Sequence, residues 1–414
     1  MRLNYVNWGH KFLYLHIFTI SWSAVARLSD WAPLPLVFLF LATVSAFVQF
    51  LSEANSARPL LGRGYKIDYL VLIAFCMMCL NVLYNPTFKS GNYLLAYGVV
   101  FGVYLVYSAA GVNKVGTNGI LKYNYYGINF ICSFLVLEVI ARSVLGFDIF
   151  QWIPRTKEAT ALVTPGLMRA YGLSTEPTQV GNYLACFVPY AVFYRSKIAR
   201  KSTLMYSIFL VVAAILTFSA ALAAVILSGV LIGLVITKQK IKMIKWIVLV
   251  GIVLAVGFAL LIYSLGIGDL LYLAYDKVAG KLVLSQDGGG SVGSRMTSLS
   301  AGVAMIMENP ALGAGLGYAS SLGQDSSINF YIFLASETGL FVVALFVFWF
   351  VFHLVNAVLN HQQTGDEIFL YASISLYSGI AYLFFLSTFQ NLYLLTSILF
   401  YRIILKNITE SKRR

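Results

Sequence analysis

The sequence predicts an all-α integral membrane protein, a polytopic bundle of about 12 transmembrane helices with two long loops on the outer side. The chain has 414 residues, of which 59% are hydrophobic and only 11% are charged, and its mean hydropathy is +0.80. A soluble chain carries roughly a quarter charged residues, so the composition excludes an ordinary soluble domain. Apolar runs of about 20 residues, the length that spans a bilayer, recur along the chain, and basic residues gather in alternate connections.

The transmembrane helices are expected at the apolar runs. These runs lie near residues 12–27, 31–52, 67–84, 92–112, 124–145, 178–195, 203–219, 220–237, 244–267, 329–352, 367–386 and 389–405. The stretch from Thr203 to Ile236 is too long for one helix, because a helix rises about 1.5 Å per residue and the bilayer core is about 30 Å thick. Basic clusters flank it, RSKIARK before and KQKIKMIK after, and both favour the cytoplasm. We therefore expect two crossings with a tight turn near Ser219.

The distribution of basic residues predicts the orientation. With both termini in the cytoplasm, the cytoplasmic segments contain 20 of the 29 lysine and arginine residues, as the positive-inside rule requires. The net charge of +13 then reflects topology, and no nucleic-acid partner is expected. The basic tail ESKRR suits contact with acidic membrane lipids. No cleavable signal peptide is expected, because the first apolar run lacks a small-residue cleavage site.

These assignments divide the chain into five segments. Residues 1–145 form the N-terminal membrane helices, and residues 146–177 form the first outer loop. Residues 178–267 form the central membrane helices, and residues 268–328 form a large outer loop with an amphipathic helix. Residues 329–414 form the C-terminal membrane helices and the basic cytoplasmic tail. Long loops in a compact bundle are usually functional or disordered, so these two loops are where polar chemistry is expected.

The first outer loop re-enters the membrane through RAYGLSTEPT, which begins at Arg169. Arg169 and Glu176 lie just outside the next apolar run, and Gly172 and Pro177 follow them as turn residues. Both charged side chains are candidates for a site at the membrane boundary. The alternative is an ordinary interfacial arginine beside a carboxylate that favours the start of a helix.

The second outer loop contains a predicted amphipathic helix with a cation near its start. The helix is expected from Ser294, as N-cap, to Asn309–Pro310, with Arg295 in its first turn. Its apolar stripe consists of Met296, Leu299, Val303 and Ile306. Free backbone N–H groups and a guanidinium at one helix start suit an oxyanion or phosphate. The alternative is a helix lying flat on the membrane, with Arg295 touching lipid headgroups.

Ionisable side chains near the apolar runs narrow the possible chemistry. Glu337 lies inside the run that begins at 329, where a carboxylate costs roughly a few kcal/mol; it faces a substrate or is satisfied by a neighbouring polar group. The histidines are His10, His16, His353 and His361, and all are expected in the cytoplasmic half. An outer active site would therefore use carboxylates as acid–base groups, with Glu176, Asp325 and Glu337 as candidates.

No cofactor and no metal are expected. The GAGLG stretch at Gly313–Gly317 has neither the preceding strand nor the following helix and lysine of a nucleotide-binding loop. We expect it to form a turn that permits close packing. The cysteines, all inside apolar runs, are expected to behave as small hydrophobic residues. They are Cys76, Cys79, Cys132 and Cys186.

Four stretches, in their order, resemble the O-antigen polymerase and ligase superfamily of bacterial cell-surface polysaccharide assembly. They are MRAYGLSTEPTQVGNYLA, ILTFSAALAAVILS, GSRMTSLSAGVAMIMENPALGAGLG and SINFYIFLASETGLFVVALF. They are similar to the family's arginine–glycine segment, threonine–serine span, basic outer helix and following entry span. The resemblance covers about residues 168–350, whereas the first 160 residues match in hydropathy alone.

Two departures from the family pattern favour its polymerase branch. Family ligases typically carry a His-Asn pair eleven residues before a glycine, and counting back from Gly339 places Ile328 at the histidine position, with Asn329 kept beside it. Ala220 stands where family members often carry an arginine after the Thr-x-Ser stretch. The missing histidine argues against a ligase, which is expected to activate its acceptor hydroxyl with that side chain.

The resemblance implies a membrane glycosyltransferase of the bacterial inner membrane, with its active site facing the periplasm. Its substrate would be an undecaprenyl-diphosphate-linked oligosaccharide, and its reaction the polymerisation of repeat units into O-antigen or a similar polysaccharide. A chain-length-determining co-polymerase would be a protein partner. The catalytic residues expected are Arg169, Arg295 and Glu176. The substrate-binding residues expected are Asp325, Asn329 and Glu337.

Three other functions remain open from the sequence. The first is a ligase that transfers glycan to lipid A–core. The second is a flippase or transporter, since about 12 helices with both termini inside is also a common transporter layout. The short basic central connections and the long late outer segments favour an enzyme over a transporter. The third is a non-catalytic scaffold.

Overall fold

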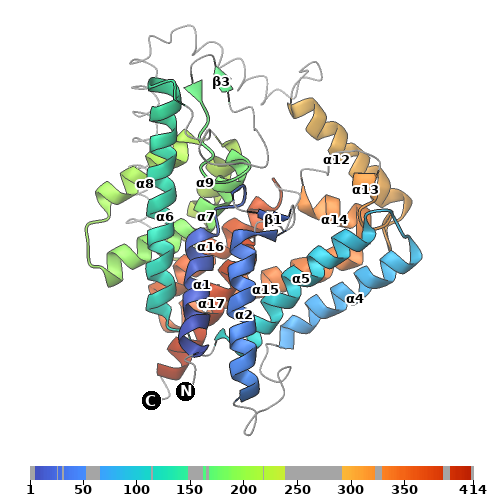
Figure 1. Ribbon diagram of the computed structural model, residues 1–414, viewed down its shortest axis with the longest axis horizontal. Helices are drawn as coiled ribbons and strands as arrows, with labels where there is room; N and C mark the ends of the chain where they lie inside the picture. The colour runs from blue at the N-terminus through green and yellow to red at the C-terminus, as the bar shows by residue number, and fades with distance from the viewer. Residues whose placement is uncertain are drawn as a thin grey trace.

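The computed structural model describes residues 5–25, 27–29, 32–52, 66–112, 115–147, 162–164, 167–217, 219–237, 291–321, 329–385 and 392–411. Regular structure in these residues is almost wholly helical (Figure 1). The helices are α1 (Tyr5–Thr19), α2 (Leu34–Ser52), α4 (Tyr69–Tyr84), α5 (Ser90–Ala110), α6 (Thr117–Val139), α7 (Pro177–Phe193), α8 (Leu204–Leu216), α9 (Ala220–Ile236), α12 (Ser291–Glu308), α13 (Tyr318–Ser321), α14 (Phe330–Thr338), α15 (Leu340–Thr364), α16 (Glu367–Tyr382) and α17 (Tyr393–Ser411).

Short irregular elements complete the described chain. A 3₁₀ turn, Lys66–Asp68, precedes α4, and π-helical turns extend α6 (Ile140–Val144) and α7 (Tyr194–Ile198). Two antiparallel strand pairs also form. They are β1 (Arg27–Ser29) with β2 (Ala32–Pro33), and β3 (Leu162–Thr164) with β4 (Leu167–Met168).

Long apolar helices support the predicted class, an all-α membrane protein. Within the described residues, five helical segments are long and apolar enough to cross a membrane. They are Leu34–Ser52, Lys66–Tyr84, Ser90–Ala110, Thr117–Val144 and Leu340–Thr364. α9 is apolar around its whole circumference and leaves Leu227, Leu231 and Val235 exposed, as lipid-facing positions would be. The expected helix at 244–267 lies outside the described residues, and the count of about 12 crossings remains a prediction.

The apolar run from Thr203 to Ile236 forms two helices, as the sequence predicts. α8 ends at Leu216 and α9 begins at Ala220. The Ser219 hydroxyl accepts a hydrogen bond from the backbone N–H of Leu222 at 3.3 Å. Ser219 is therefore the N-cap of α9, and it satisfies a backbone donor that the first helical turn leaves without a partner.

The predicted span 329–352 is wrong in its boundaries, because the chain breaks at Gly339. This residue adopts φ +89° and separates α14 from α15, which continues to Thr364. The backbone N–H of Leu340 donates to the carbonyl of Pro310 at 2.9 Å. A Cβ on Gly339 would overlap the Ala311 carbonyl, so the break depends on glycine. The membrane-length helix therefore starts and ends about a dozen residues later than predicted.

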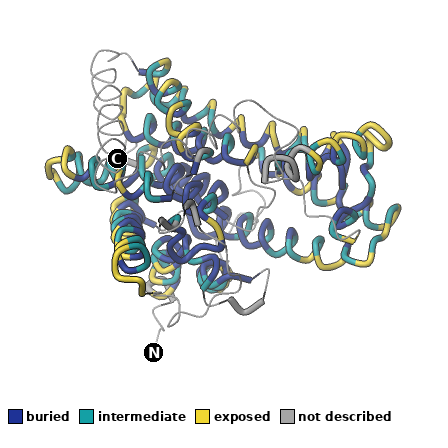
Figure 2. The backbone as a smooth tube through the Cα atoms, turned by 90° about the horizontal axis from the view of Figure 1, so that it is seen from above, coloured by how far each residue is buried: buried dark blue, intermediate teal, exposed yellow. Residues whose placement is uncertain are grey.

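Helices from both halves of the chain build the centre of the molecule. α16 contacts α7, α9, α15 and α17, while α1 packs on α2 and α6. α4 and α5 form a hairpin that extends to one side and packs on α15 (Figure 1). Buried backbone gathers in the middle of the bundle, and exposed residues lie along its periphery (Figure 2). The described helices of the first 145 residues are thus part of the same core as the stretches that resemble the polysaccharide family.

Contacts between connections define two ends of the bundle. At one end, the backbone N–H of Ala24 donates to the Leu173 carbonyl at 3.0 Å, and Thr87 Oγ1 donates to the Leu316 carbonyl at 2.7 Å. We call this the loop end. At the other, the terminal end, Lys197 Nζ pairs with Glu367 Oε1 at 2.8 Å. Segments predicted to be outer thus meet one another, as do segments predicted to be cytoplasmic; which end faces the cytoplasm remains a prediction.

Candidate functional site

The segment that carries Arg169 is held at the loop end by the end of α8 and by the connection that follows α1. The backbone N–H of Ala170 donates to the Leu216 carbonyl at 2.9 Å, at the end of α8. The Leu173 carbonyl accepts from Ala24, and Ser174 Oγ donates to the Ser21 carbonyl at 2.7 Å. Residues 170–175 are all buried. We call residues 169–175 the RAYGLST segment; its backbone is rigid because its polar groups are bonded in place.

Arg169 lies against the threonine–serine stretch that joins α8 to α9. Its Nε donates to the Thr217 carbonyl at 3.3 Å. It also interacts electrostatically with the hydroxyl of Tyr382, which lies 3.3 Å from Ser219 Oγ. Two stretches that resemble family motifs, about 50 residues apart in sequence, therefore meet here. A guanidinium oriented by a carbonyl at a helix end is suited to bind a phosphate oxygen.

Glu138 and Arg142 lie directly behind the RAYGLST segment. Glu138 Oε2 accepts the backbone N–H of Gly172 at 2.8 Å and that of Tyr171 at 3.2 Å. Arg142 Nη1 donates to Glu138 Oε1 at 3.3 Å and to the Tyr171 hydroxyl at 3.1 Å. The Arg142 guanidinium also lies over the Tyr171 ring, 5.4 Å from its centroid. The sequence analysis did not single out either residue, although a carboxylate and an arginine within one apolar run were a signal.

Glu176 lies at the N-cap of α7, beside the same segment, with Pro177 in the first helical turn. Its side chain is exposed and makes no capping hydrogen bond. Only its backbone serves the helix, through a carbonyl that accepts from Gln179 at 3.1 Å. The carboxylate is therefore open to solvent at the loop end, seven residues after Arg169 in the chain.

The GAGLG stretch is a packed turn, as predicted, and the α4–α5 corner surrounds it. Asn81 Nδ2 donates to the Leu312 carbonyl, and Asn81 Oδ1 accepts from the Leu316 backbone N–H at 3.0 Å. Ser90 Oγ donates to the Leu316 carbonyl at 2.8 Å. Gly313 adopts φ +68°, and a Cβ there would overlap the backbone of Glu337. An asparagine inside a predicted apolar span thus fixes a loop more than 200 residues away.

Glu337 lies in α14, before the crossing helix, and is fully buried. Its backbone carbonyl accepts from Gly315 at 3.0 Å and from Asn81 Nδ2 at 3.2 Å. Among the described residues, no group meets hydrogen-bonding geometry with either carboxylate oxygen. The nearby amides of Gly317 and Ala319 contribute favourable electrostatics only.

Among the remaining predicted site residues, Arg295 is placed differently from the expectation. Arg295 lies in the second turn of α12, because the helix begins at Ser291 and not after Ser294; its side chain is outside the described residues. The prediction that Arg295 lies beside the free N–H groups at the start of this helix is therefore wrong. Asn329 caps α14, where its Oδ1 accepts from Tyr331 at 3.0 Å. Asp325 and Ile328 lie outside the described residues.

One histidine lies at the loop end, contrary to the expectation that all four are on the other side. His16 is in the last turn of α1, since α1 begins and ends earlier than the predicted span 12–27. It is fully buried. Its Nδ1 lies 2.8 Å from the Pro35 carbonyl and its Nε2 lies 2.9 Å from Thr396 Oγ1. Both ring nitrogens are engaged inside the bundle, so the imidazole does not face the surface near Arg169.

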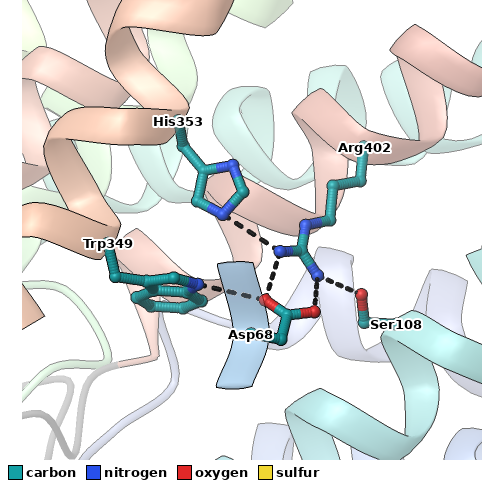
Figure 3. Close-up of polar contacts among 5 residues, drawn as sticks. All are labelled: Asp68, Ser108, Trp349, His353 and Arg402. Carbon is teal, nitrogen blue, oxygen red and sulfur yellow. Dashed lines mark hydrogen bonds and ion pairs between the residues drawn. The ribbon is translucent and has the colours of Figure 1, made fainter. Parts of the chain in front are cut away.

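A second polar cluster consists of five buried residues inside the bundle (Figure 3). Arg402 pairs with Asp68 through both terminal nitrogens, with Nη1 2.7 Å from Oδ2. Arg402 also donates to Ser108 Oγ and to His353 Nε2, the latter at 3.0 Å. Trp349 Nε1 donates to Asp68 Oδ1 at 3.0 Å. Because an arginine only donates, His353 accepts through Nε2 and is neutral.

Arg402 is one of the 20 basic residues expected on the cytoplasmic side, and the structure corrects its environment. Its side chain is fully buried and its charge is compensated by Asp68. The guanidinium also lies 5.5 Å from the centroid of the Tyr104 ring. It therefore contributes an internal ion pair and not a solvated cytoplasmic charge. Removing it from the count leaves the bias of the remaining basic residues unchanged in direction.

The fold and these clusters define a helical membrane protein with a fixed arginine and an exposed carboxylate together at the loop end. No family model matches the chain, and a search of curated proteins finds no similar sequence.

Proposed function

We propose that the protein is a membrane polysaccharide polymerase that extends undecaprenyl-diphosphate-linked oligosaccharides at the outer face of the bacterial inner membrane. The observation that supports this proposal is the contact of Arg169 with the Thr217 carbonyl, on a segment that leads directly to the exposed Glu176. The motif resemblance puts both stretches in one site, and they are in contact. The two long outer loops and the periplasmic orientation belong to the same proposal.

The chemistry requires a cation more than a nucleophile. The hydroxyl oxygen of an incoming lipid-linked repeat attacks the anomeric carbon of the growing chain, and the bond from that carbon to the diphosphate breaks. The lipid diphosphate leaves with the bonding electrons, so negative charge develops on its oxygens. A fixed guanidinium stabilises that charge through paired, charge-assisted hydrogen bonds. Arg169 would perform this role, with Arg295 of α12 as the expected second cation.

Glu176 would receive the proton of the attacking hydroxyl. It is exposed, is not used to cap its helix, and is attached to the same segment as Arg169. A carboxylate within reach of an acceptor hydroxyl can orient it and take its proton during bond formation. Asn329 and Asp325 would contribute to the surface that binds the sugar, and the buried Glu337 would support it from within the fold. In this assignment Glu337 lies beneath the GAGLG turn, and Asn329 also caps α14.

A ligase is less well supported than a polymerase. Ile328 stands where family ligases carry a histidine, and His16, at the loop end, has both ring nitrogens engaged in the bundle. An exposed histidine base is therefore absent from the described part of the loop end. The exposed Glu176 is instead available as a carboxylate base, as the polymerase proposal requires.

A transporter is the second candidate, and one observation favours it. Asp68, Arg402 and His353 form a charged cluster inside the bundle, and intramembrane charges often mark ion or substrate pathways in transporters. An assay without two compartments separates the candidates. Protein in lipid nanodiscs should lengthen lipid-linked repeats extracted from a strain that lacks this gene. A transporter has no product in that assay.

Replacement of Arg169 tests the proposal in cells. Deleting the gene should reduce the surface polysaccharide ladder to species with one repeat unit. A plasmid copy with Arg169→Ala should leave that pattern unchanged at normal protein level, and Arg169→Lys should restore only part of the ladder, because lysine lacks the bidentate fork. Electrophoresis of surface polysaccharide gives the readout.

Lys201→Ala is the matched control, since Lys201 is an exposed basic residue at the terminal end. It should restore the full ladder. A normal ladder with Arg169→Ala would show that Arg169 is only an interfacial anchor. Loss of every capped species on deletion of the gene would instead indicate a ligase or a flippase.

A further inference from the structure

We infer that Glu138 is a positioning residue, which sets the direction of Arg169 by binding the backbone of the RAYGLST segment, and that Arg142 orients Glu138. This inference rests on the proposed function of Arg169. It assigns a role to two charged residues in a helix that the motif resemblance does not include. The carboxylate reaches the site from α6, whereas the segment it binds lies before α7.

The two oxygens of the Glu138 carboxylate bind different groups: one binds the backbone of the RAYGLST segment, and the other binds Arg142. Oε2 receives two adjacent backbone N–H groups, from Tyr171 at 3.2 Å and Gly172 at 2.8 Å. Oε1 receives Arg142 at 3.3 Å. Two converging amides fix the peptide planes on either side of Tyr171, two residues after Arg169. Gly172 adopts φ +57°, and this left-handed turn directs the chain towards Ser174 and α7.

Neither Glu138 nor Arg142 is itself suited to bind a phosphate. The side chain of Glu138 is 1% exposed and that of Arg142 is 10% exposed. The guanidinium is neutralised by Glu138, bonded to the Tyr171 hydroxyl and stacked on the Tyr171 ring. A paired, covered arginine offers little net charge to a ligand. Its contacts with Tyr171, and with the carboxylate that binds the backbone of Tyr171 and Gly172, act on the segment that carries Arg169.

The backbone around Arg142 supports a dedicated arrangement. α6 changes to a π-helical turn at Ile140–Val144, which includes Arg142. Such turns insert an extra residue per turn and recur at functional sites. Here the π turn lies directly after Glu138, at the end of α6 where Arg142 must turn towards Tyr171. A charged pair at this depth costs free energy, and a gain in catalysis offsets that cost if the pair fixes a reactive arginine.

A matched pair of double variants tests the inference. Glu138→Gln with Arg142→Met removes both charges but keeps an amide oxygen that can accept from Tyr171 and Gly172. Glu138→Leu with Arg142→Met removes both charges and the acceptor. Neither variant leaves a buried charge without a partner. The assay is extension of lipid-linked repeats, extracted from a strain lacking this gene, by protein in nanodiscs, with kcat and KM measured separately.

We expect the leucine double variant to have a kcat about a hundredfold below that of the glutamine double variant, since a misplacement of about 1 Å can cost that much. KM and the thermal midpoint should differ little between the two. A merely structural role would lower the thermal midpoint and the amount of folded protein, with kcat per folded molecule unchanged. Equal kcat values for the two double variants, with Arg169→Ala inactive, would overturn the inference and leave the proposed function intact.

Two further outcomes are decisive. If the leucine double variant does not accumulate, Glu138→Asp replaces it, because it keeps the charge pair but withdraws the acceptor by one methylene. A parent-like kcat for Glu138→Asp would then overturn the inference. If Arg169→Ala retains the parent kcat, the proposed function of Arg169 is wrong, and the positioning role fails with it.

Discussion

Gly339 shows how a single residue decides where the membrane-length helix begins. Its φ of +89° belongs to a region that residues with a side chain rarely adopt. The neighbouring Leu340 donates to the Pro310 carbonyl, and the Ala311 carbonyl occupies the space of a Cβ. The Asn309–Pro310 stretch at the end of α12 is therefore locked to the start of α15.

Gly339→Ala should destabilise the protein by about 2 kcal/mol or more, since a left-handed residue with a side chain and a steric overlap both add strain. The thermal midpoint of purified protein in detergent measures this effect. Gly102→Ala is the matched control: Gly102 lies within α5, and nothing lies within 4 Å of its added Cβ. It should be neutral or slightly stabilising. Equal midpoints for the two variants would contradict the structural role of Gly339.

Some site residues were predictable from the sequence, and others were not, for a physical reason. Arg169 and Glu176 are charged residues at the edge of an apolar run, so their placement at a boundary follows from hydropathy. Glu138 lies in another helix and bonds to a segment 33 and 34 residues away. Only the folded backbone shows that two amides converge on its carboxylate. His16 was assigned to the wrong half because the first helix starts and ends several residues earlier than its apolar pattern indicates.

At the scale of elements, the residues that flank an apolar run predicted its helices better than the residues inside the run. Basic clusters on both sides of residues 203–237 required an even number of crossings, and the structure divides that run at Ser219. The run beginning at 329 has no such signal, because the break at Gly339 arises from a tertiary contact with Pro310 and Ala311. A glycine inside an apolar pattern is usually tolerated in a helix, so it did not predict the break.

The Asp68–Arg402 pair connects the start of α4 to the middle of α17. Removing one partner of a buried pair leaves an uncompensated charge and costs about 3–5 kcal/mol, whereas removing both can be nearly neutral. Arg402→Met and Asp68→Asn should therefore each lower the thermal midpoint in detergent. The double variant should recover most of the loss, and asparagine keeps an acceptor for Trp349.

The same variants show whether the Asp68–Arg402 pair is only structural or takes part in the function of the protein. If the cluster is structural, polymerisation by the double variant should recover together with its stability. A double variant that is stable but inactive would indicate that the charges themselves take part in function, as in a transporter. Lys197→Met is a suitable control, because its ion pair with Glu367 is exposed and should contribute less than about 1 kcal/mol.

At the scale of the whole molecule, the chain separates two kinds of polar chemistry between two ends. The loop end contains Arg169, Glu176 and the packed GAGLG turn, while the terminal end contains the basic stretch 195–201, the start of α1 and the end of α17 (Figure 1). Lateral contact with lipid suits the exposed apolar faces between them. A lipid-linked substrate could then present its diphosphate at the loop end while its chain stays in the bilayer.

The orientation of these two ends is the prediction on which the proposed function depends most. The substrate of a periplasmic polymerase is displayed at the outer leaflet, so Arg169 must face outward. We expect a membrane-impermeant maleimide, applied to intact cells, to label Phe88→Cys, because Phe88 lies at the loop end and is 97% exposed. Ser202→Cys, exposed at the terminal end, should be labelled only after lysis. Both variants are made in a background without the four native cysteines, since Cys76 is itself exposed. The basic residues of the terminal end predict this result through the positive-inside rule. Labelling of Ser202→Cys but not Phe88→Cys in intact cells would place Arg169 in the cytoplasm, and the polymerase proposal would then be wrong.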